Sequence, residues 1–372
     1  MSKNRADRNP GYRRPDRAGK TKMKTSCEHP QTPAPRTQHP TPKGFSRYTM
    51  MDTKSDSKYV KQAEMLANRV KKQYKHLKKK FARQNIEVFR LYDGDIPEIR
   101  AAVDWYAGHL VVAEYTRRDS NPQWLPMMGN AVAQALNVTP ENLHLKERQA
   151  GHQDGKRYQR FDTTNRKIVM QERDLKFYIN LWDYVDTGLF SDHRNTRMMV
   201  REMAQGKHLL NLFCYTGAFS CHGAKGGARS TTSVDRSQST IEWARENMIL
   251  NGVPMEHNHL IQADTFDFLK ETADTGQRFD LCVVDPPSFF TRRSRGDHFD
   301  IDRDHPALLK SVINVMNPGG TIYFSTNHQD FTPRMEHLPL ESHKEITKAT
   351  IPEDYQRKHK QIHRCWKLLV KS

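Results

Sequence analysis

Three short blocks follow predicted strands in a fixed order along the chain, and their residue types suit the binding of a nucleoside. Residues 211–217 end an apolar run in a turn with a glycine, residues 233–235 end the next run in an acid, and residues 283–288 contain an Asp-Pro-Pro turn. In an open parallel sheet, ligands bind at the carboxyl ends of the strands. A glycine turn followed about twenty residues later by an acid supplies backbone amides and a carboxylate for ribose hydroxyls.

The first two blocks favour a cofactor without phosphates. Only Gly217 is well placed, and the Gly-x-Gly-x-x-Gly pattern that approaches a dinucleotide pyrophosphate is missing, which argues against a dehydrogenase. S-adenosylmethionine needs partners for an amino-acid end, a ribose and an adenine. We predict that the amino-acid end is bound by Tyr215, Thr216 and Gly217. Asp235 is predicted to accept from the ribose, and Asp264 is predicted to accept from the adenine amino group. Asn211, which opens the first block, is predicted to belong to the same cofactor site.

The third block predicts a site for a planar base. Asp285 and the carbonyls of the turn at Pro286 can hold a base edge, and Phe289 can stack on a base swung out of its helix. Methylation of a pyrimidine carbon needs a cysteine thiolate, but Ser288 and residues 325–327 include no cysteine. A ring nitrogen such as guanine N7 carries a lone pair, so transfer to it needs alignment and a dry site but no base. An exocyclic amine must also lose a proton, which Asp285 could accept.

The composition indicates a polyanionic partner. The 372 residues carry a net charge of +17, and neither a membrane-spanning run nor a signal peptide is visible, which predicts a cytoplasmic protein that binds nucleic acid. The five cysteines are scattered, three of them in predicted core elements including Cys282, so a disulfide framework is not expected. The histidines are dispersed along the chain, and we predict no metal site.

Three regions differ in composition. Residues 1–57 are basic and rich in proline, which predicts a disordered arm. Residues 58–186 are predicted to form a basic helix, 58–84, followed by a small α+β RNA-binding module. Residues 187–372 are predicted to form the cofactor-binding domain. The helix should bury Leu66, Val70, Tyr74, Leu77 and Phe81. The predicted RNA-binding residues, on its other face and in a basic, aromatic loop, are Lys71, Lys72, Lys75, Lys78, Lys79 and Arg157.

From residue 187 onward, predicted strands and helices alternate, which indicates an α/β fold with a doubly wound sheet. Ser191 is predicted to cap a helix that runs to Gln205. The further predicted strands are 208–213, 229–234, 258–262, 279–284, 320–325, 342–347 and 362–370. The predicted helices between them are 217–226, 238–251, 265–273 and 304–316. In the preceding module, the predicted strands are 87–92, 110–115, 143–146, 167–170 and 176–180, with a helix near 123–137.

Several motifs closely resemble the RlmK-type 23S rRNA guanine-N7 methyltransferases, which form the C-terminal half of the bifunctional RlmKL enzymes. The resemblance covers about residues 60 to 370. The motifs are Asn211-Leu-Phe-Cys-Tyr-Thr-Gly217, Trp243-Ala-Arg-Glu-Asn247, Asp285-Pro-Pro-Ser-Phe289, Asp186-Thr-Gly-Leu-Phe-Ser-Asp-His-Arg194 and Gln361-Ile-His-Arg-Cys-Trp366.

The resemblance implies a class I S-adenosylmethionine-dependent methyltransferase, a Rossmann-like sheet with a C-terminal antiparallel strand, acting on guanine N7 in domain V of 23S rRNA. It also implies that Asp192 and Arg194 close over the cofactor from the N-terminal side.

Three alternatives remain open from the sequence. The same fold could methylate N2 of guanine or C5 of cytosine, although the missing cysteine argues against the second. A non-catalytic rRNA-binding assembly factor would predict a degraded cofactor site, yet Gly217, Asp235 and Asp285 are all present.

Overall fold

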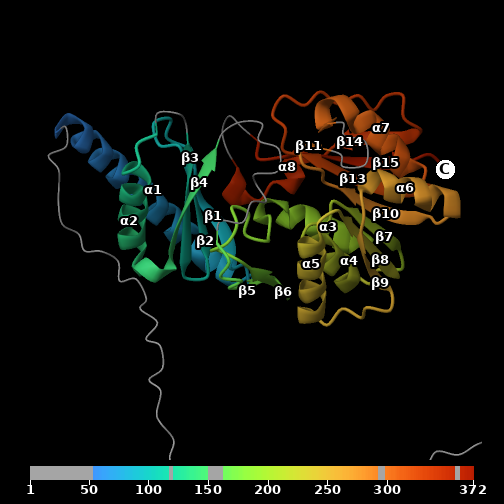
Figure 1. The fold of residues 1–372 in the computed structure, drawn as a ribbon, viewed down its shortest axis with the longest axis horizontal. Coiled ribbons are helices and arrows are strands. Elements are labelled where there is room, and N and C mark those ends of the chain that lie inside the picture. Colours follow the sequence, from blue (N-terminus) through green and yellow to red (C-terminus); the bar gives the residue numbers. More distant parts are fainter. Residues whose placement is uncertain (1–52, 117–119, 150–161, 292–297, 357–360) are drawn as a thin grey trace, which may run out of the picture. The chain divides into compact units, whose positions relative to one another are not determined.

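A computed structural model describes residues 53–116, 120–149, 162–291, 298–356 and 361–372. They form an N-terminal module with its own sheet, a two-stranded hairpin and a seven-stranded sheet flanked by helices (Figure 1). No helix among these residues is both long and apolar enough to cross a membrane. The predicted arm, 1–57, lies outside the described residues up to position 52, and the first helix begins at Thr53.

The N-terminal module consists of two helices packed on one face of a mixed sheet. Strands β1, β2 and β3 pair antiparallel, whereas β4 pairs parallel to β3 because α2 carries the chain back between them. The predicted apolar face of α1 is confirmed: Leu66, Val70, Leu77 and Phe81 are buried and Tyr74 packs beside them. The elements are α1 (Thr53–Ala82), β1 (Val88–Asp93), β2 (Ala101–Tyr106), β3 (His109–Thr116), α2 (Trp124–Leu136) and β4 (Leu143–Gln149).

Strand β2 is absent from the sequence prediction. It contains Asp104, a residue depleted in strands, and this side chain is buried. The guanidinium of Arg90 on β1 donates to both carboxylate oxygens of Asp104, at 2.8 and 3.0 Å. The strand is therefore stabilised by a partner on its neighbour, which a local pattern cannot reveal.

A hairpin of β5 (Ile168–Glu172) and β6 (Leu175–Ile179) follows the module and packs on helix α5 (Gln238–Leu250). Side-chain oxygens of Asn251 and Asn247 accept from the backbone amides of Lys176 and Tyr178, each at 2.8 Å. These amides belong to an otherwise open edge of the hairpin, so the asparagines satisfy donors that would be left unpaired.

The seven-stranded sheet confirms the predicted doubly wound fold. Its order is β14-β15-β13-β10-β7-β8-β9, and only β15 runs against its neighbours. The predicted closing antiparallel strand is therefore β15, inserted between β13 and β14. The strands are β7 (His208–Leu212), β8 (Ser230–Asp235), β9 (Asn258–Gln262), β10 (Phe279–Val284), β13 (Met316–Thr326), β14 (Leu340–Glu345) and β15 (Arg364–Val370).

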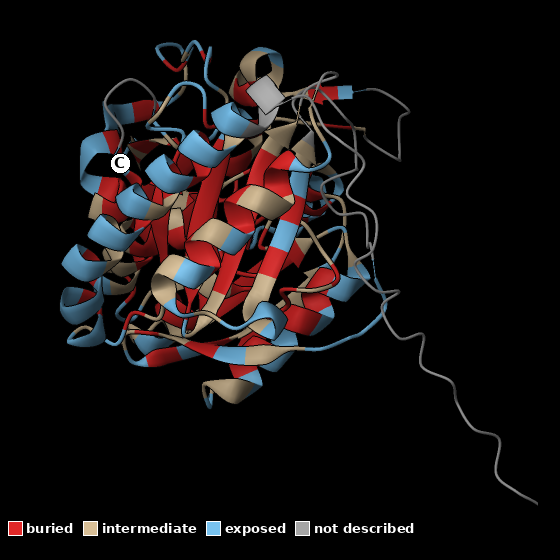
Figure 2. Cartoon of the chain, turned by 90° about the vertical axis from the view of Figure 1, so that its left-hand side faces the viewer, coloured by how far each residue is buried: buried red, intermediate tan, exposed pale blue. Residues whose placement is uncertain are grey.

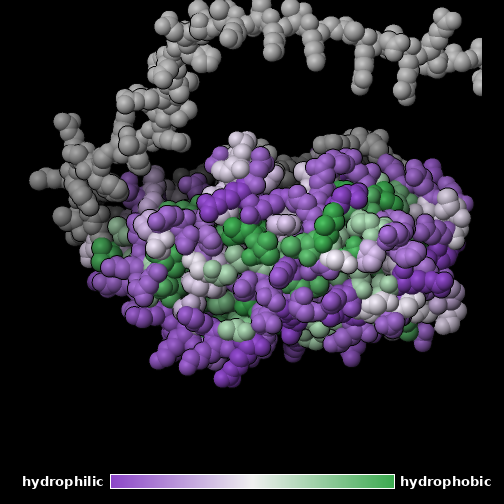
Figure 3. Space-filling model, turned by 90° about the horizontal axis from the view of Figure 1, so that it is seen from below, coloured by the Kyte–Doolittle hydropathy of each residue, from purple (hydrophilic) through white to green (hydrophobic). Residues whose placement is uncertain are grey.

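Successive residues of the central strands bury opposite faces of this sheet, as the two-residue period of a strand requires. Leu210 and Cys282 pack toward α6 and α7, whereas Leu209 and Leu281 pack toward α3 and α4. The helices are α3 (Arg194–Met203), α4 (Ala218–Lys225), α6 (Thr265–Thr275), α7 (Ile301–Ile313) and the short α8 (Thr347–Thr350). In Figure 2 the helices nearest the viewer are pale blue on their outer surfaces and the strands behind them are red. Figure 3 shows a largely hydrophilic surface in which hydrophobic residues form small patches.

A third hydrophobic cluster crosses the predicted boundary at residue 187. It brings Val88 and Tyr106 of the module together with Cys221 of α4 and Met248 of α5. The module and the large sheet are thus packed on a shared apolar layer, and the domain limits stay a prediction.

One local prediction fails, and one short pair of strands was not predicted. Ser191 makes no capping bond; it opens a 3-10 turn before α3, and its hydroxyl bonds to Tyr355 at 2.6 Å. The segment after the Asp-Pro-Pro turn forms a small antiparallel pair, β11 (Phe289–Thr291) and β12 (His298–Asp300), that the sequence did not indicate. Strands of three residues are too short for a periodic pattern to show.

Candidate functional site

The turn after β7 has a left-handed backbone at three positions. Phe213, Tyr215 and Gly217 have φ angles of 54°, 49° and 75°. For the two residues that are not glycine this conformation costs about 1–3 kcal/mol each, and such strain clusters at functional turns. A Cβ at Gly217 would lie 2.9 Å from Cβ of Ala244, so only glycine fits against α5.

Asp235 ends β8, the strand beside β7, and its carboxylate is fixed by backbone amides. Oδ2 accepts from the amide of Tyr215 at 3.0 Å, and Oδ1 accepts from the amide of Ser237 at 2.9 Å. Burial raises the pKa of Asp235, and these two hydrogen bonds oppose the shift. Each carboxylate oxygen has two acceptor positions, so both oxygens can still accept from two adjacent hydroxyls.

Asp264 follows β9, the next strand along this edge. Its Oδ1 accepts from the amide of Phe266 at 2.9 Å and so caps α6. Among the described residues nothing bonds to Oδ2, which leaves an acceptor for an amino group. Asp235 and Asp264 thus lie at the carboxyl ends of adjacent parallel strands, as predicted.

The Asp-Pro-Pro turn follows β10, on the other side of β7. The hydroxyl of Ser325, near the end of β13, donates to Oδ1 of Asp285 at 2.6 Å. The hydroxyl of Ser288 donates to Asn327 at 2.5 Å. The turn is therefore held by the residues that end the neighbouring strand, and the side chain of Asp285 stays partly exposed.

Phe289 begins β11 and is half-buried. Its ring stacks on His298 of β12, with ring centroids 5.5 Å apart and an interplanar angle of 17°. The β11–β12 pair therefore fixes the ring close to the Asp-Pro-Pro turn. Its role toward a base stays a prediction.

A pair of buried histidines lies next to Asp285, and the sequence reasoning assigned neither of them a role. His193 and His363 stack with centroids 4.1 Å apart and planes 12° apart. Nε2 of His193 lies 3.6 Å from Asp285 and 3.8 Å from Asp192, while His363 Nδ1 lies 3.1 Å from Asp192. The other ring nitrogen of His363 bonds to the hydroxyl of Thr350.

Charges around this pair favour an ionised Asp192 and a neutral His193. Burial raises the pKa of Asp192, but His193 and the hydrogen bond from His363 outweigh it and bring the pKa below its ordinary value. Burial and the neighbouring His363 lower the pKa of His193. Because Nε2 of His193 lies near two carboxylates, we infer that it carries the proton, so that the N–H dipole points toward Asp285.

Asp192, His193 and His363 also have the composition of a metal site, since one ligand atom from each lies within 4.8 Å of the others. The stacking argues for another use. Nitrogen lone pairs lie in the ring plane, so nearly parallel stacked rings direct them side by side rather than toward one point. The hydrogen bonds of His363 to Asp192 and Thr350 suit a relay that orients side chains next to Asp285.

Three predicted cofactor residues have their side chains engaged elsewhere. The guanidinium of Arg194 donates to Asp354 at 3.1 and 3.3 Å and lies over the ring of Phe81, toward the module, and its role toward the cofactor stays a prediction. Asn211 is inside β7 and donates to Ser220 of α4, because its position in the strand turns it to the core.

The hydroxyl of Thr216 donates to the carbonyl of Gly188 at 2.6 Å, which ties the cofactor turn to the segment before α3. Thr216 can then offer a ligand only its backbone groups. Its backbone carbonyl already accepts from the side chain of Asn247.

The predicted RNA-binding lysines lie on the exposed side of α1. Lys71, Lys72, Lys75, Lys78 and Lys79 are all exposed. Arg157 lies outside the described residues. Whether these side chains bind RNA stays a prediction.

The described cysteines offer no nucleophile beside the Asp-Pro-Pro turn. Cys214, Cys221, Cys282 and Cys365 are buried and unpaired. Cys282, three residues before Asp285, is fully buried in β10, and burial raises the pKa of its thiol well above the ordinary value. A buried thiol that stays protonated is a poor nucleophile.

Comparisons with known proteins agree with this arrangement. A family model of S-adenosylmethionine-dependent methyltransferases matches residues 98–348. The ribosomal RNA large subunit methyltransferase K of Neisseria meningitidis serogroup B is 41% identical over 315 residues, which cover 82% of this chain and 87% of the relative. The ribosomal RNA large subunit methyltransferase K/L of Magnetococcus marinus is 40% identical over 316 residues, and the match covers 82% of this chain but 43% of that longer protein.

Two solved structures share the fold. A methyltransferase crystallised with SAH has a TM-score of 0.66 at 23% identity, covering 84% of this chain and 82% of its own. An S-adenosylmethionine-dependent methyltransferase from Streptococcus mutans has a TM-score of 0.64 at 21% identity, covering 87% of this chain and 83% of its own.

Proposed function

Since the chain belongs to the S-adenosylmethionine-dependent methyltransferases, we propose that it transfers a methyl group to N7 of a guanine in large-subunit ribosomal RNA. The names of both relatives support the RNA substrate. The choice of a nitrogen atom is supported chiefly by the Asp285 turn, which offers acceptors for a base edge and has no reactive thiol beside it among the described residues.

The donor set along the carboxyl edge fits S-adenosylmethionine. Asp235 has two oxygens with open acceptor positions for the ribose hydroxyls, Asp264 has one for the adenine amino group, and the turn at Gly217 supplies backbone groups for the amino-acid end. When bound, the cofactor supplies an activated methyl group on its sulfonium. Asp192 is proposed to border this site through its contacts with His193 and His363.

The protein is proposed to act by positioning the base. Oδ2 of Asp285 can accept from the N1–H and the exocyclic amine of guanine, while Ser325 fixes Oδ1. His193, with its N–H directed at the same carboxylate, helps to orient Asp285. Phe289 stacks on the base and excludes water. Because N7 has a lone pair and no proton, correct alignment is sufficient and no general base is needed.

Exposed lysines on α1, from Lys71 to Lys79, are proposed to bind the RNA backbone. Their charge has one sign along one face of a helix, which supplies affinity without reading sequence.

The test is methyl transfer to large-subunit rRNA from cells that lack this gene, followed by nuclease digestion and nucleoside mass spectrometry. The proposal predicts a new 7-methylguanosine peak with the wild-type protein and S-adenosylmethionine. Asp267→Ala, which removes an exposed carboxylate from α6, should retain it, and Asp285→Ala should lose most of it.

Three other results would contradict the proposal. N2-methylguanosine would move the reaction to the exocyclic amine and make Asp285 a proton acceptor; 5-methylcytidine would contradict the argument from the thiols. No methylated nucleoside, on either naked rRNA or precursor subunits, would favour a non-catalytic assembly factor.

A further inference from the structure

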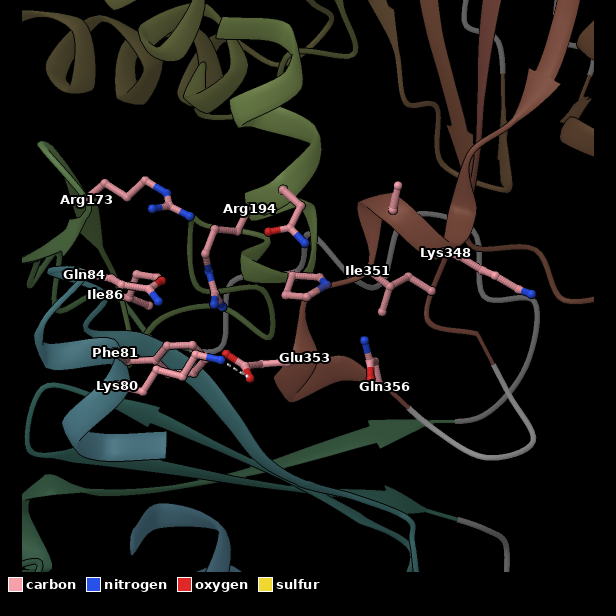
Figure 4. A pocket seen from close by; sticks show the side chains of 13 residues that line it. Lys80, Phe81, Gln84, Ile86, Arg173, Arg194, Lys348, Ile351, Glu353 and Gln356 are labelled. Atoms are coloured by element: carbon pink, nitrogen blue, oxygen red, sulfur yellow. Dashed lines mark hydrogen bonds and ion pairs between the residues drawn. The ribbon is translucent and has the colours of Figure 1, made fainter. Parts of the chain in front are cut away.

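A cavity lies between the N-terminal module and the large sheet. Its volume is about 340 Å³, and it is bounded by the end of α1, the β5–β6 turn, the start of α3 and the segment from α8 onward (Figure 4). Ligand-binding pockets begin at about 300 Å³, so this cavity is larger than a single small ion requires.

The cavity is lined mainly by positive charge. Lys80, Arg173, Arg194 and Lys348 contribute four cations, against one carboxylate from Glu353. Lys80 and Glu353 form an ion pair at 2.6 Å, drawn as a dashed line in Figure 4.

Two of these cations lack counterions. Within the described part of the chain, the guanidinium of Arg173 and the ammonium of Lys348 have no carboxylate partner. Arg173 is half-buried, so an anion beside its unpaired guanidinium would offset the cost of burying that charge, whereas Lys348 is exposed and adds a second cation to the lining.

The cavity also contains buried donors without acceptors. Nε of Arg173 and Nε of Arg194 are both shielded from solvent and bond to no described residue. Figure 4 shows both guanidinium groups extending into the space that the lining residues enclose. Arg194 is buried and already uses its terminal nitrogens on Asp354, Val88 and Ser191, so Nε is the donor left for a ligand. Unsatisfied buried donors of charged groups are costly, and they indicate a missing acceptor.

A phosphate suits these donors because it presents several acceptor oxygens around one negative centre. The remaining lining favours a phosphate that belongs to RNA. The side chains of Gln84, Asn195 and Gln356 bond to no described residue and could hydrogen-bond ribose or base groups. Lys80 directly follows Lys79, the last of the lysines proposed to bind RNA.

This cavity shares a wall with the proposed methyl-transfer site. Consecutive residues at the start of α3 face different sides, because His193 lies beside Asp285 whereas Arg194 lines the cavity. Similarly, Thr350 of α8 bonds to His363, while Lys348 lines the cavity. Since a helix with its side chains is about 10 Å across, nearby nucleotides of one strand could occupy both sites.

We propose that this cavity binds a backbone phosphate of the RNA substrate, a few nucleotides from the base that is methylated. The inference rests on the proposed RNA substrate. It assigns to Arg173, Arg194 and Lys348 a binding role that is separate from both the cofactor and the methylated base.

The test compares two charge-matched double variants of the full chain. Arg173→Gln with Lys348→Gln removes the two unpaired cations of the cavity. Lys176→Gln with Lys344→Gln removes two exposed cations elsewhere, on β6 and β14. Binding to a transcript of 23S rRNA domain V is measured without S-adenosylmethionine across a salt series, and cofactor affinity is measured separately by calorimetry.

The cavity variant should bind the transcript about tenfold more weakly than wild type, with the salt slope reduced by about 1. The matched variant should change by less than about twofold, and both should bind S-adenosylmethionine like wild type. In a second arm, inorganic phosphate at constant ionic strength should raise the Tm of wild type and of the matched variant more than that of the cavity variant.

Equal RNA affinity of the two double variants would overturn the inference. If phosphate stabilised the wild type specifically while RNA affinity did not change, the site would take a free anion and RNA as its source would be wrong. If wild type did not bind the transcript at all, the proposed substrate would fail, and a missing phosphate effect would then reject the cavity as well.

Discussion

The carboxyl edge of the seven-stranded sheet and the contact between that sheet and the N-terminal module both contain many charges, but they use them differently. At the edge, Asp235 and Asp264 bond to backbone amides close by and keep acceptor positions open. At the contact, Arg194 bonds to Asp354, and Arg197 bonds to Glu172 at 2.6 and 2.7 Å, with all four side chains buried.

The carboxylates of the edge keep acceptor positions open for a ligand, whereas those of the contact stabilise the fold. A carboxylate fixed by the backbone is oriented without being neutralised, so it can still serve a ligand. A carboxylate that is paired with a buried arginine cannot bind a ligand. The pair instead holds together two segments that are far apart in the sequence. Substitutions at the contact should therefore affect unfolding, whereas substitutions at the edge should affect binding and turnover.

The largest expected effect is at the contact. Arg194→Met leaves the buried Asp354 without its cation, so that Asp354 must stay unpaired or take up a proton, and should lower the free energy of unfolding by about 3–5 kcal/mol in urea titrations at neutral pH. Arg69→Met, which breaks the exposed pair with Asp95, should cost less than about 1 kcal/mol. Adding Asp354→Leu to Arg194→Met should restore most of the loss. If the double variant were no more stable than Arg194→Met, the loss of stability would not come from breaking the ion pair.

At the edge, the expected effect is kinetic. Asp285→Ala removes the carboxylate proposed to hold the guanine edge and should reduce kcat by about 100-fold or more. RNA affinity and unfolding should change little, because Asp285 is partly exposed. Asp267→Ala is the matched control for the loss of one carboxylate. Retention of kcat by Asp285→Ala would remove this residue from the mechanism.

A pH series sharpens the comparison further. Burial raises the pKa of Asp354 to about 6, against the opposing effect of Arg194. Because this pKa lies above the ordinary value of 3.8, protonation favours the folded state, and the contribution is full below about pH 4 and lost as pH rises through about 6.

Asp354→Asn cannot titrate and serves as the reference. The unfolding free energy of wild type minus that of Asp354→Asn should fall by up to about 3 kcal/mol between about pH 4 and about pH 7. A difference that is constant over this range would contradict the raised pKa.

The sequence predicts the residues of the carboxyl edge better than it predicts contacts between segments that are far apart in the chain. Gly217, Asp235, Asp264 and Asp285 could be located because each comes directly after a strand, and parallel strands bring their carboxyl ends together. The stacking of His193 on His363 could not be predicted, because the two residues are 170 positions apart and meet only where β15 inserts between β13 and β14.

Side-chain direction is the other limit. The resemblance to known motifs gives the position of Arg194 but not that its guanidinium turns to Asp354, whose segment lies 160 residues further on. Asn211 belongs to the correct motif, yet its place within β7 directs it into the core. In both cases the motif specifies where the residue lies along the chain, whereas the partners of its side chain depend on tertiary structure.

We propose that the carboxyl edge of the large sheet binds S-adenosylmethionine through Asp235. Calorimetric titration of the cofactor into wild type, Asp235→Ala and Asp267→Ala tests it most directly. Loss of hydrogen bonds to a charged group should weaken binding to Asp235→Ala by about 10- to 100-fold, and Asp267→Ala should bind like wild type. Cofactor binding by Asp235→Ala as tight as that of wild type would contradict the proposed site.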